Sequence, residues 1–243
     1  MMAPMTLVDV RPAASRFHTE LGWLDSWHSF SFGPHYDAAN THHGLLLVSN
    51  DDRVRPARGF GSHSHRDMEI VTWVLSGTLE HRDSAGNHGV LYPGLAQRMS
   101  AGTGISHSEM NPSPTDDVHF VQMWVVPDTN GLQPGYEQRD INEALDRGGL
   151  HPIASGQDHD GAVVVHQRDA VLWGGRLQPG ERVAVPEAAH VHVFIARGGA
   201  TLDGATLDGA ALDQGDAARV TDSAALSLTA EPGGAEVLIW ATA

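Results

Sequence analysis

Two pairs of side chains with metal-binding chemistry constrain this sequence more than any other feature. His63 and His65 are separated by one residue, and so are His107 and Glu109. In a β-strand successive side chains point to opposite faces, so residues i and i+2 share a face. If the two strands face each other inside a barrel, three imidazoles and one carboxylate surround one point. That set suits a first-row divalent metal with positions left open for substrate or dioxygen.

The segment between the two pairs predicts antiparallel β structure. Residues 70–75 are β-branched, aromatic and apolar, which is typical of a strand. Ser76 and Gly77 form a turn, and residues 78–82 are expected to return as a second strand. Residues 83–87 then supply the residue types of a hairpin turn. A meander of this kind can bring the two ligand pairs together although they are distant in the sequence.

A competing carboxylate is present near the first pair. Glu69 has the strand parity of His63 and His65 and is therefore an alternative ligand to Glu109. Its other expected role is to accept a hydrogen bond from a ligand imidazole or from an arginine. An isolated His-x-His pair is often a surface pair or a hydrogen-bonded barrel residue. The second pair, and the glycines before both pairs, favour the metal site.

Composition excludes several classes of protein. The chain has 243 residues and no cysteine, so it forms no disulfide and offers no thiolate, which weakens the case for a structural zinc site. A formal charge of −15 argues against a nucleic-acid groove. The sequence contains no apolar run of the roughly 18–20 residues that span a bilayer. The first residues lack the pattern of a signal peptide, so we expect a cytoplasmic protein without membrane or direct nucleic-acid partners.

The stretch 59–111 resembles the two motifs of the cupin family. Its two parts have the forms Gly59-x-x-x-His63-x-His65-x-x-x-Glu69 and His107-x-x-x-Asn111. The sequence departs from the usual form in two places. The interval to Gly77 is one residue longer, and Gly102 stands where proline is common in that family.

The fuller wording resembles the pirin family, and is closest to its bacterial quercetinase-like branch. The resemblance covers nearly the whole chain and is densest between Leu24 and Gln138. The segments that carry it are Trp27–Gly33, Phe60–Ile70, Ser100–Glu109 and Trp124–Gly131.

This resemblance implies an all-β fold of two tandem cupin barrels, each a double-stranded β-helix similar to a jelly roll. We expect the metal-binding barrel in residues 1–131 and a connector in residues 132–150, with a short helix near 141–147. A second barrel is expected in residues 151–243.

The second half aligns with the first without its ligands. Ala184, Pro186, Leu228 and Ala230 fall at the positions of the four predicted ligands. The pair His190-x-His192 is out of register and has no second pair, so it is expected not to bind metal. Residues 201–210 contain two Asp-Gly pairs, which predict successive tight turns.

The pirin resemblance also assigns the site and favours Glu109 over Glu69. It implies one divalent transition metal ion bound by His63, His65, His107 and Glu109. Fe(II) is favoured, although copper, nickel, manganese and zinc accept such ligands.

The same resemblance implies a reaction in which dioxygen adds across the 2,3 bond of a flavonol such as quercetin, carbon monoxide leaves and a depside forms. Glu109 would then also be the catalytic base for the 3-hydroxyl group. The alternative is a non-catalytic, metal- or redox-responsive regulator that acts through a protein partner.

Gln122 and Trp124 share strand parity, so they either line the cavity or pack in the barrel wall.

Overall fold

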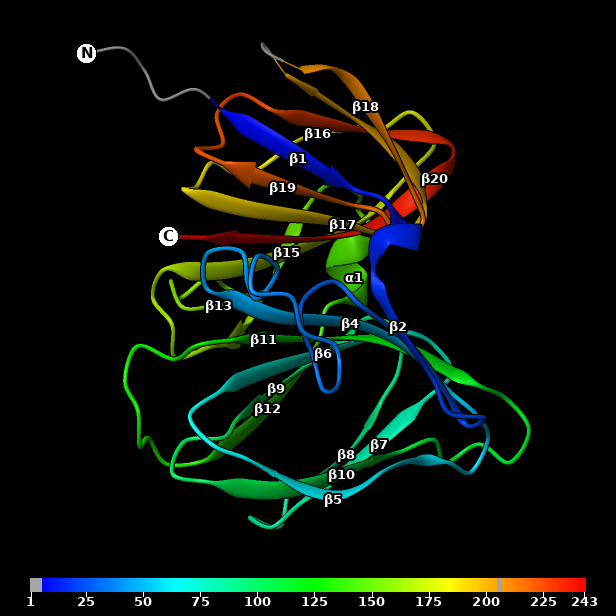
Figure 1. The fold of residues 1–243 in the computed structure, drawn as a ribbon, viewed down its shortest axis with the longest axis vertical. Coiled ribbons are helices and arrows are strands. Elements are labelled where there is room, and N and C mark those ends of the chain that lie inside the picture. Colours follow the sequence, from blue (N-terminus) through cyan, green and yellow to red (C-terminus); the bar gives the residue numbers. More distant parts are fainter. Residues whose placement is uncertain (1–5, 205–206) are drawn as a thin grey trace.

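The structure is a computed structural model that describes residues 6–204 and 207–243, and it consists almost entirely of β-strands. The strands form two barrels that lie one above the other in Figure 1. The expected all-β architecture is therefore confirmed. None of the described helices is long and apolar enough to cross a bilayer.

The first barrel is built from two antiparallel sheets. The larger has seven strands in the order β12-β9-β6-β11-β4-β3-β2, and the smaller has four in the order β5-β10-β7-β8. The bounds of these strands are β2 Phe17–Glu20, β3 Leu24–His28, β4 Leu46–Val54, β5 Gly59–His65, β6 Glu69–Ser76, β7 Leu79–Asp83, β8 His88–Leu91, β9 Leu95–Ser100, β10 Ile105–Met110, β11 Val118–Val125 and β12 Gly135–Asp140.

The chain changes sheet between β5 and β6. Asp67 lies in this connection with a φ of 48°, a left-handed conformation that Asp tolerates better than most residues. Its side-chain Oδ1 accepts a hydrogen bond of 2.6 Å from the backbone N–H of Gly131. Because of this corner, Glu69 begins a strand of the seven-stranded sheet, whereas His65 ends a strand of the four-stranded one.

The second barrel is a nine-stranded sheet built on two long strands, β17 and β20. Its main path runs β1-β19-β17-β20-β15-β13-β14, with β16 paired to β20 and β18 to β17. The bounds are β1 Leu7–Arg11, β13 His151–Ser155, β14 Val163–Val164, β15 Ala170–Leu177, β16 Arg182–Ala184, β17 His190–Gly204, β18 Leu207–Asp213, β19 Ala217–Thr221 and β20 Ser227–Thr242.

Two short helical segments lie outside the strands in the part of the chain that the structure describes. The 3-10 helix η1 spans Ala13–Ser15, and α1 spans Asn142–Leu145 within the connector that was expected to hold a helix.

Two features of the second barrel differ from a simple tandem repeat. Strand β1 precedes the first barrel in sequence but pairs with β19 along its whole length, so the start of the range 1–131 belongs to the second sheet (Figure 1). The expected turn at Asp208-Gly209 is wrong, because both residues lie inside β18. Asp203-Gly204 likewise ends β17. Residues 205–206, between these strands, lie outside the described chain.

The two barrels share one apolar core. The largest buried cluster contains side chains of both, among them Trp73 and Met123 of the first and Trp240 of the second. Two indole groups bond across the junction: Trp73 Nε1 donates to Glu236 Oε1 (3.0 Å), and Trp240 Nε1 lies 3.2 Å from Met123 Sδ. Because these side chains pack between the two barrels, the space between the two sheets of the first barrel remains available for the candidate site.

Candidate metal centre

The pairing of β5 with β10 brings the three predicted histidines together. His63 lies directly opposite His107 in the antiparallel register. Ligand nitrogens of His63, His65 and His107 all lie within 4.8 Å of one another. The rings of His63 and His107 are 4.4 Å apart, centroid to centroid. The i, i+2 spacing thus places both side chains of the first pair on the same face of the sheet as His107.

The histidine nitrogens are arranged as unprotonated ligands. His63 Nδ1 lies 2.8 Å from the carbonyl oxygen of Gly61, so this nitrogen carries the proton and Nε2 keeps its lone pair. The Nε2 atoms of His65 and His107 are buried and have no hydrogen-bond partner among the described residues. Because buried polar atoms are almost always paired, orphaned lone pairs beside one another fit a metal ion.

A third pair of side chains, which sequence reasoning missed, fixes the tautomer of His107. Strand β7 places His81 opposite Glu109 and Asp83 opposite His107. His81 Nε2 faces Asp83 Oδ2 at 3.2 Å and donates its proton to that carboxylate. The Nδ1 atom of His81 is then an acceptor for His107 Nδ1–H, 3.3 Å away. His107 Nε2 is left free for a metal. The available signal was the spacing His81-x-Asp83, which repeats the i, i+2 logic of the other pairs.

Burial keeps the imidazoles of His65 and His107 neutral. It lowers the pKa of His65 to about 4, with a smaller contribution from the nearby His63. It lowers the pKa of His107 to about 3, and charge on His63 and His65 acts in the same direction. Metal ligation requires the neutral imidazole. His65 and His107 therefore present unprotonated nitrogens across the neutral pH range.

Glu109 is buried within the same barrel. An oxygen of its carboxylate lies within 4.8 Å of ring nitrogens of His81 and His107, and its side chain lines one cavity with His63 and His65. Gln122 Nε2 donates to both carboxylate oxygens at 2.9 Å, and Gln122 Oε1 accepts from Trp124 Nε1 at 3.1 Å. Burial raises the pKa of Glu109. A cation beside it would favour the ionised form.

The cavity between the two sheets has a volume of about 230 Å³. Its aromatic wall contains Phe32, Phe60 and Trp124, and the Trp124 ring meets His65 edge-on at 4.8 Å. Gln122 and Trp124 both line this cavity, so of the two roles considered for them the cavity-lining one is confirmed.

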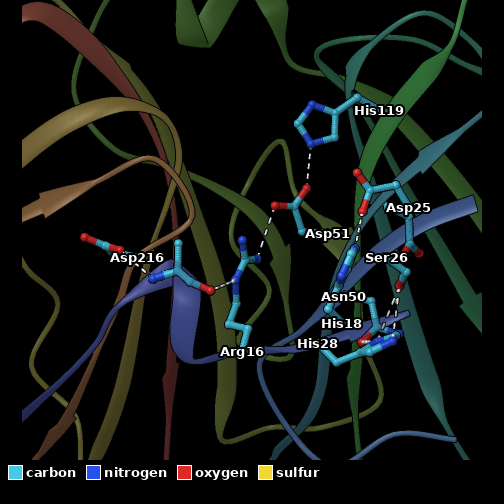
Figure 2. Close-up of polar contacts among 11 residues, drawn as sticks. Arg16, His18, Asp25, Ser26, His28, Asn50, Asp51, His119 and Asp216 are labelled. Carbon is cyan, nitrogen blue, oxygen red and sulfur yellow. Dashed lines mark hydrogen bonds and ion pairs between the residues drawn. The ribbon is translucent and has the colours of Figure 1, made fainter. Parts of the chain in front are cut away.

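The cavity also has a polar part of its lining. Gln122, Asn50 and His28 lie side by side across β11, β4 and β3. The Nδ1 atom of His28 is 2.8 Å from Asn50 Oδ1 (Figure 2). In this part of the lining Ser26 donates to Asp52, and burial raises the pKa of Asp52 to about 7. The cavity thus combines the histidine cluster with aromatic side chains and with hydrogen-bonding side chains.

Glu69, the competing carboxylate, is occupied elsewhere. It accepts hydrogen bonds from Ser100 Oγ (2.8 Å) and from the backbone N–H of His166 (3.1 Å). It belongs to neither of the two potential metal-binding clusters found among the described residues. Its hydrogen bonds thus connect the start of β6 to β9 and to the backbone at His166. Among the described residues it bonds to no arginine and to none of the three clustered histidines.

The second barrel lacks such a cluster in its described part. Its counterpart of the β5–β10 pair is β16–β20, where Val183 faces Leu228 and Ala184 faces Ser227. This register is shifted by one residue from the sequence alignment, which matched Ala184 and Leu228 to the facing pair His63 and His107. His192 is buried against Phe30.

Comparison with known proteins agrees with this geometry. Residues 9–125 match the family model described as Pirin, and residues 152–240 match the quercetinase C-terminal cupin domain. A Mycobacterium tuberculosis protein, named provisionally as a quercetin 2,3-dioxygenase, is 59% identical over 235 residues, covering 96% of this chain and 94% of the relative. The quercetin 2,3-dioxygenase of Escherichia coli K12 is 43% identical over 199 residues, covering 81% and 84%.

Solved structures show the same fold. YhhW from Escherichia coli superposes with a TM-score of 0.89 at 38% identity, over 98% of each chain. The structure described as bacterial pirin YhhW in complex with nickel(II) gives a TM-score of 0.87 at 38% identity, over 96% of this chain and 98% of that one. These matches confirm the expected pair of cupin barrels and support binding of a divalent metal. The chain belongs to the pirin family.

Proposed function

We propose that this protein is a metal-dependent dioxygenase that cleaves a flavonol such as quercetin at its 2,3 bond. The observation that carries the proposal is the set of imidazole lone pairs, free and buried, beside a buried carboxylate on one cavity. The name of the 43% identical Escherichia coli relative supports the substrate class. In the overall reaction the flavonol takes up one dioxygen molecule and yields a depside and carbon monoxide, so the atoms balance without another reductant.

The ligands in this proposal are His63, His65, His107 and Glu109. A bound divalent ion would hold a deprotonated enol or catechol oxygen and would bind or polarise dioxygen. Fe(II) is the proposed native ion. Nickel is an alternative because a nickel(II) complex of the 38% identical YhhW is known, and copper, manganese and zinc accept the same donor set.

The chain itself supplies the base and the shape of the cavity. The carboxylate of Glu109 lines the cavity and would be ionised beside the bound cation, so it is placed to take the proton of the 3-hydroxyl group. Gln122 holds both carboxylate oxygens in place during this transfer. The aromatic rings of Phe32, Phe60 and Trp124 would contact the flat rings of the flavonol and exclude water.

The test is single-turnover and steady-state oxidation by protein loaded with one metal at a time under anaerobic conditions. Quercetin is added, air is admitted, and flavonol absorbance, oxygen uptake and carbon monoxide release are followed. We expect loss of absorbance with equimolar oxygen uptake, abolished in His63→Ala and retained in His42→Ala, a control at an exposed histidine.

The contrary result is saturable metal binding without turnover across several flavonols. That outcome would overturn the enzymatic assignment and favour the regulator that acts through a protein partner.

A further inference from the structure

Asn50 lines the cavity of the first barrel beside the residue that holds Glu109. In the antiparallel register Asn50 is directly opposite Gln122, whose amide nitrogen donates to both carboxylate oxygens of Glu109. Directly opposite side chains on neighbouring strands lie about 5 Å apart. Asn50 and Glu109 both line the cavity. One bound molecule can therefore contact the carboxylate and the Asn50 amide at the same time.

Only the oxygen of the Asn50 amide is bonded within the described chain. Asn50 Oδ1 lies 2.8 Å from His28 Nδ1 (Figure 2). The amide nitrogen Nδ2 donates to none of the described residues, although Asn50 is only 4% exposed, and Nδ2 is not sealed off from the cavity. Because polar atoms in such a position are rarely left without a partner, Nδ2 is a donor available to a molecule in the cavity.

A chain of hydrogen bonds determines which end of the Asn50 amide meets His28. His28 Nε2 lies 3.0 Å from Thr19 Oγ1, and Thr19 Oγ1 lies 2.9 Å from His35 Nε2. Burial lowers the pKa of His28, so its ring is neutral at pH 7 and carries one proton. Thr19 accepts from His35 and donates its single proton to His28 Nε2. The proton of the His28 ring then lies on Nδ1 and is donated to Asn50 Oδ1, which directs Nδ2 away from His28.

We propose that Asn50 selects the substrate by donating a hydrogen bond from Nδ2 to the carbonyl oxygen next to the hydroxyl group that gives its proton to Glu109. This inference rests on the proposed function and adds a recognition residue to it. An amide N–H donates and cannot accept, so it favours a carbonyl oxygen. A ring without that carbonyl leaves the N–H unpaired, which costs affinity. The cavity therefore favours 3-hydroxy-4-oxo rings, as in a flavonol, over simple phenols.

Infrared spectroscopy tests this bond directly. Nickel(II)-loaded protein is saturated without oxygen with 3-hydroxyflavone that carries carbon-13 at its carbonyl, and the carbonyl band is recorded by isotope editing. A hydrogen bond lowers the stretching frequency of a carbonyl. The band of the wild type is expected at lower frequency than the band of Asn50→Leu. It should also lie below that of the nickel(II) complex of the same flavonol in an aprotic solvent, a comparison that needs no variant.

The matched control for the infrared experiment is Asn130→Leu, at an exposed asparagine, which should keep the wild-type band. Equal band positions in wild type, Asn50→Leu and the solvent complex would overturn the proposal.

Anaerobic titration gives the corresponding change in affinity. In Asn50→Leu the Kd of 3-hydroxyflavone is expected to rise about 5–100-fold, because its carbonyl is left without a donor in a buried site. The Kd of 2-naphthol, a flat phenol without a carbonyl, should not rise. Equal losses for both ligands would show that Asn50 only shapes the cavity, and would contradict the proposal.

Thr19→Val tests the chain that positions Asn50. It keeps the shape of the side chain and removes the hydroxyl, so His28 no longer fixes the amide. The Kd of 3-hydroxyflavone should then rise by a smaller factor, about 2–10-fold, and Thr129→Val, at an exposed threonine, should leave it unchanged. An unchanged Kd in Thr19→Val would contradict the positioning role of the chain.

Binding without oxygen separates this inference from the proposed function. If the wild type binds the flavonol without turnover and Asn50→Leu loses affinity, the recognition role stands and the dioxygenase assignment fails. If the wild type turns over the flavonol while Asn50→Leu keeps its affinity and its carbonyl band, the dioxygenase assignment stands and the recognition role fails.

Discussion

His81 Nδ1 lies 3.3 Å from His107 Nδ1, and this contact sets which nitrogen of His107 faces the cluster. Asp83 accepts a hydrogen bond from the other ring nitrogen of His81. His107 therefore donates to His81, and His81 donates to the carboxylate of Asp83. Tyr136 stacks on His81 at 4.7 Å between centroids and fixes the plane of its ring. The site is thus preorganised by residues that would not touch the metal.

Replacing His81 should weaken metal binding without removing a ligand. In His81→Ala, His107 loses the acceptor that fixes its tautomer and orientation, so the metal Kd is expected to rise about 10–100-fold. Titration with nickel(II) by calorimetry or chelator competition measures the effect. His88→Ala, on the exposed neighbouring strand β8, is the control and should leave Kd unchanged. Equal affinities for wild type and His81→Ala would contradict the positioning role.

Removing the amide beside Glu109 should shift the pH dependence of metal binding. The hydrogen bond from Gln122 lowers the pKa of Glu109 against the effect of burial. In Gln122→Leu that pKa rises further, so the carboxylate ionises only at higher pH. The acidic limb of the metal-affinity profile should therefore move to higher pH, while Gln214→Leu, at an exposed position, keeps the wild-type profile. A shift in the opposite direction is incompatible with this account.

Asp52 should make the metal-free protein less stable as pH rises. Burial raises its pKa in the folded protein to about 7 from an ordinary value of 3.8. Between these values the native state binds more protons than the unfolded state, so the free energy of unfolding falls with increasing pH. Asp52→Asn removes this loss. Its advantage over wild type should grow between about pH 4 and pH 8, by up to about 4 kcal/mol. Denaturant unfolding at several pH values measures it, and a constant difference would refute the assignment.

The junction between the barrels should depend on one buried indole bond. In Trp73→Phe, the carboxylate of Glu236 loses the donor 3.0 Å away and stays buried. The expected cost is about 1–3 kcal/mol in the free energy of unfolding, measured by chemical denaturation. Trp173→Phe is the control, because that indole makes no hydrogen bond within the described chain. Similar losses in the two variants would show that ring volume, and not the bond, accounts for the cost.

The sequence was sufficient to predict that His63, His65 and His107 meet. Strand parity is a local property, so the face shared by His63 and His65 follows from their spacing alone. The strands and turns of residues 70–87 are likewise set by local residue preferences. The sequence also placed residues without metal-binding side chains at Ala184 and Leu228, although the register of β16 against β20 differs by one residue from the alignment.

Other features depend on long-range pairing that spacing cannot show. The same parity rule misjudged Glu69, because the corner at Asp67 sends β6 into another sheet. The role of His81 requires the register of β7 against β10. The pairing of β1 with β19 joins residues more than two hundred positions apart in sequence. In each case the tertiary arrangement decides which face of a strand meets which neighbour.

The most direct test of the central claim is anomalous diffraction at the nickel absorption edge from crystals of the nickel(II)-loaded protein. One peak per chain is expected within about 2.0–2.2 Å of nitrogens of His63, His65 and His107 and an oxygen of Glu109. The same peak should be lost in crystals of His63→Ala. A peak beside His190 and His192, or on the exterior of the first barrel, would contradict the assignment of the metal site and of the dioxygenase activity that depends on it.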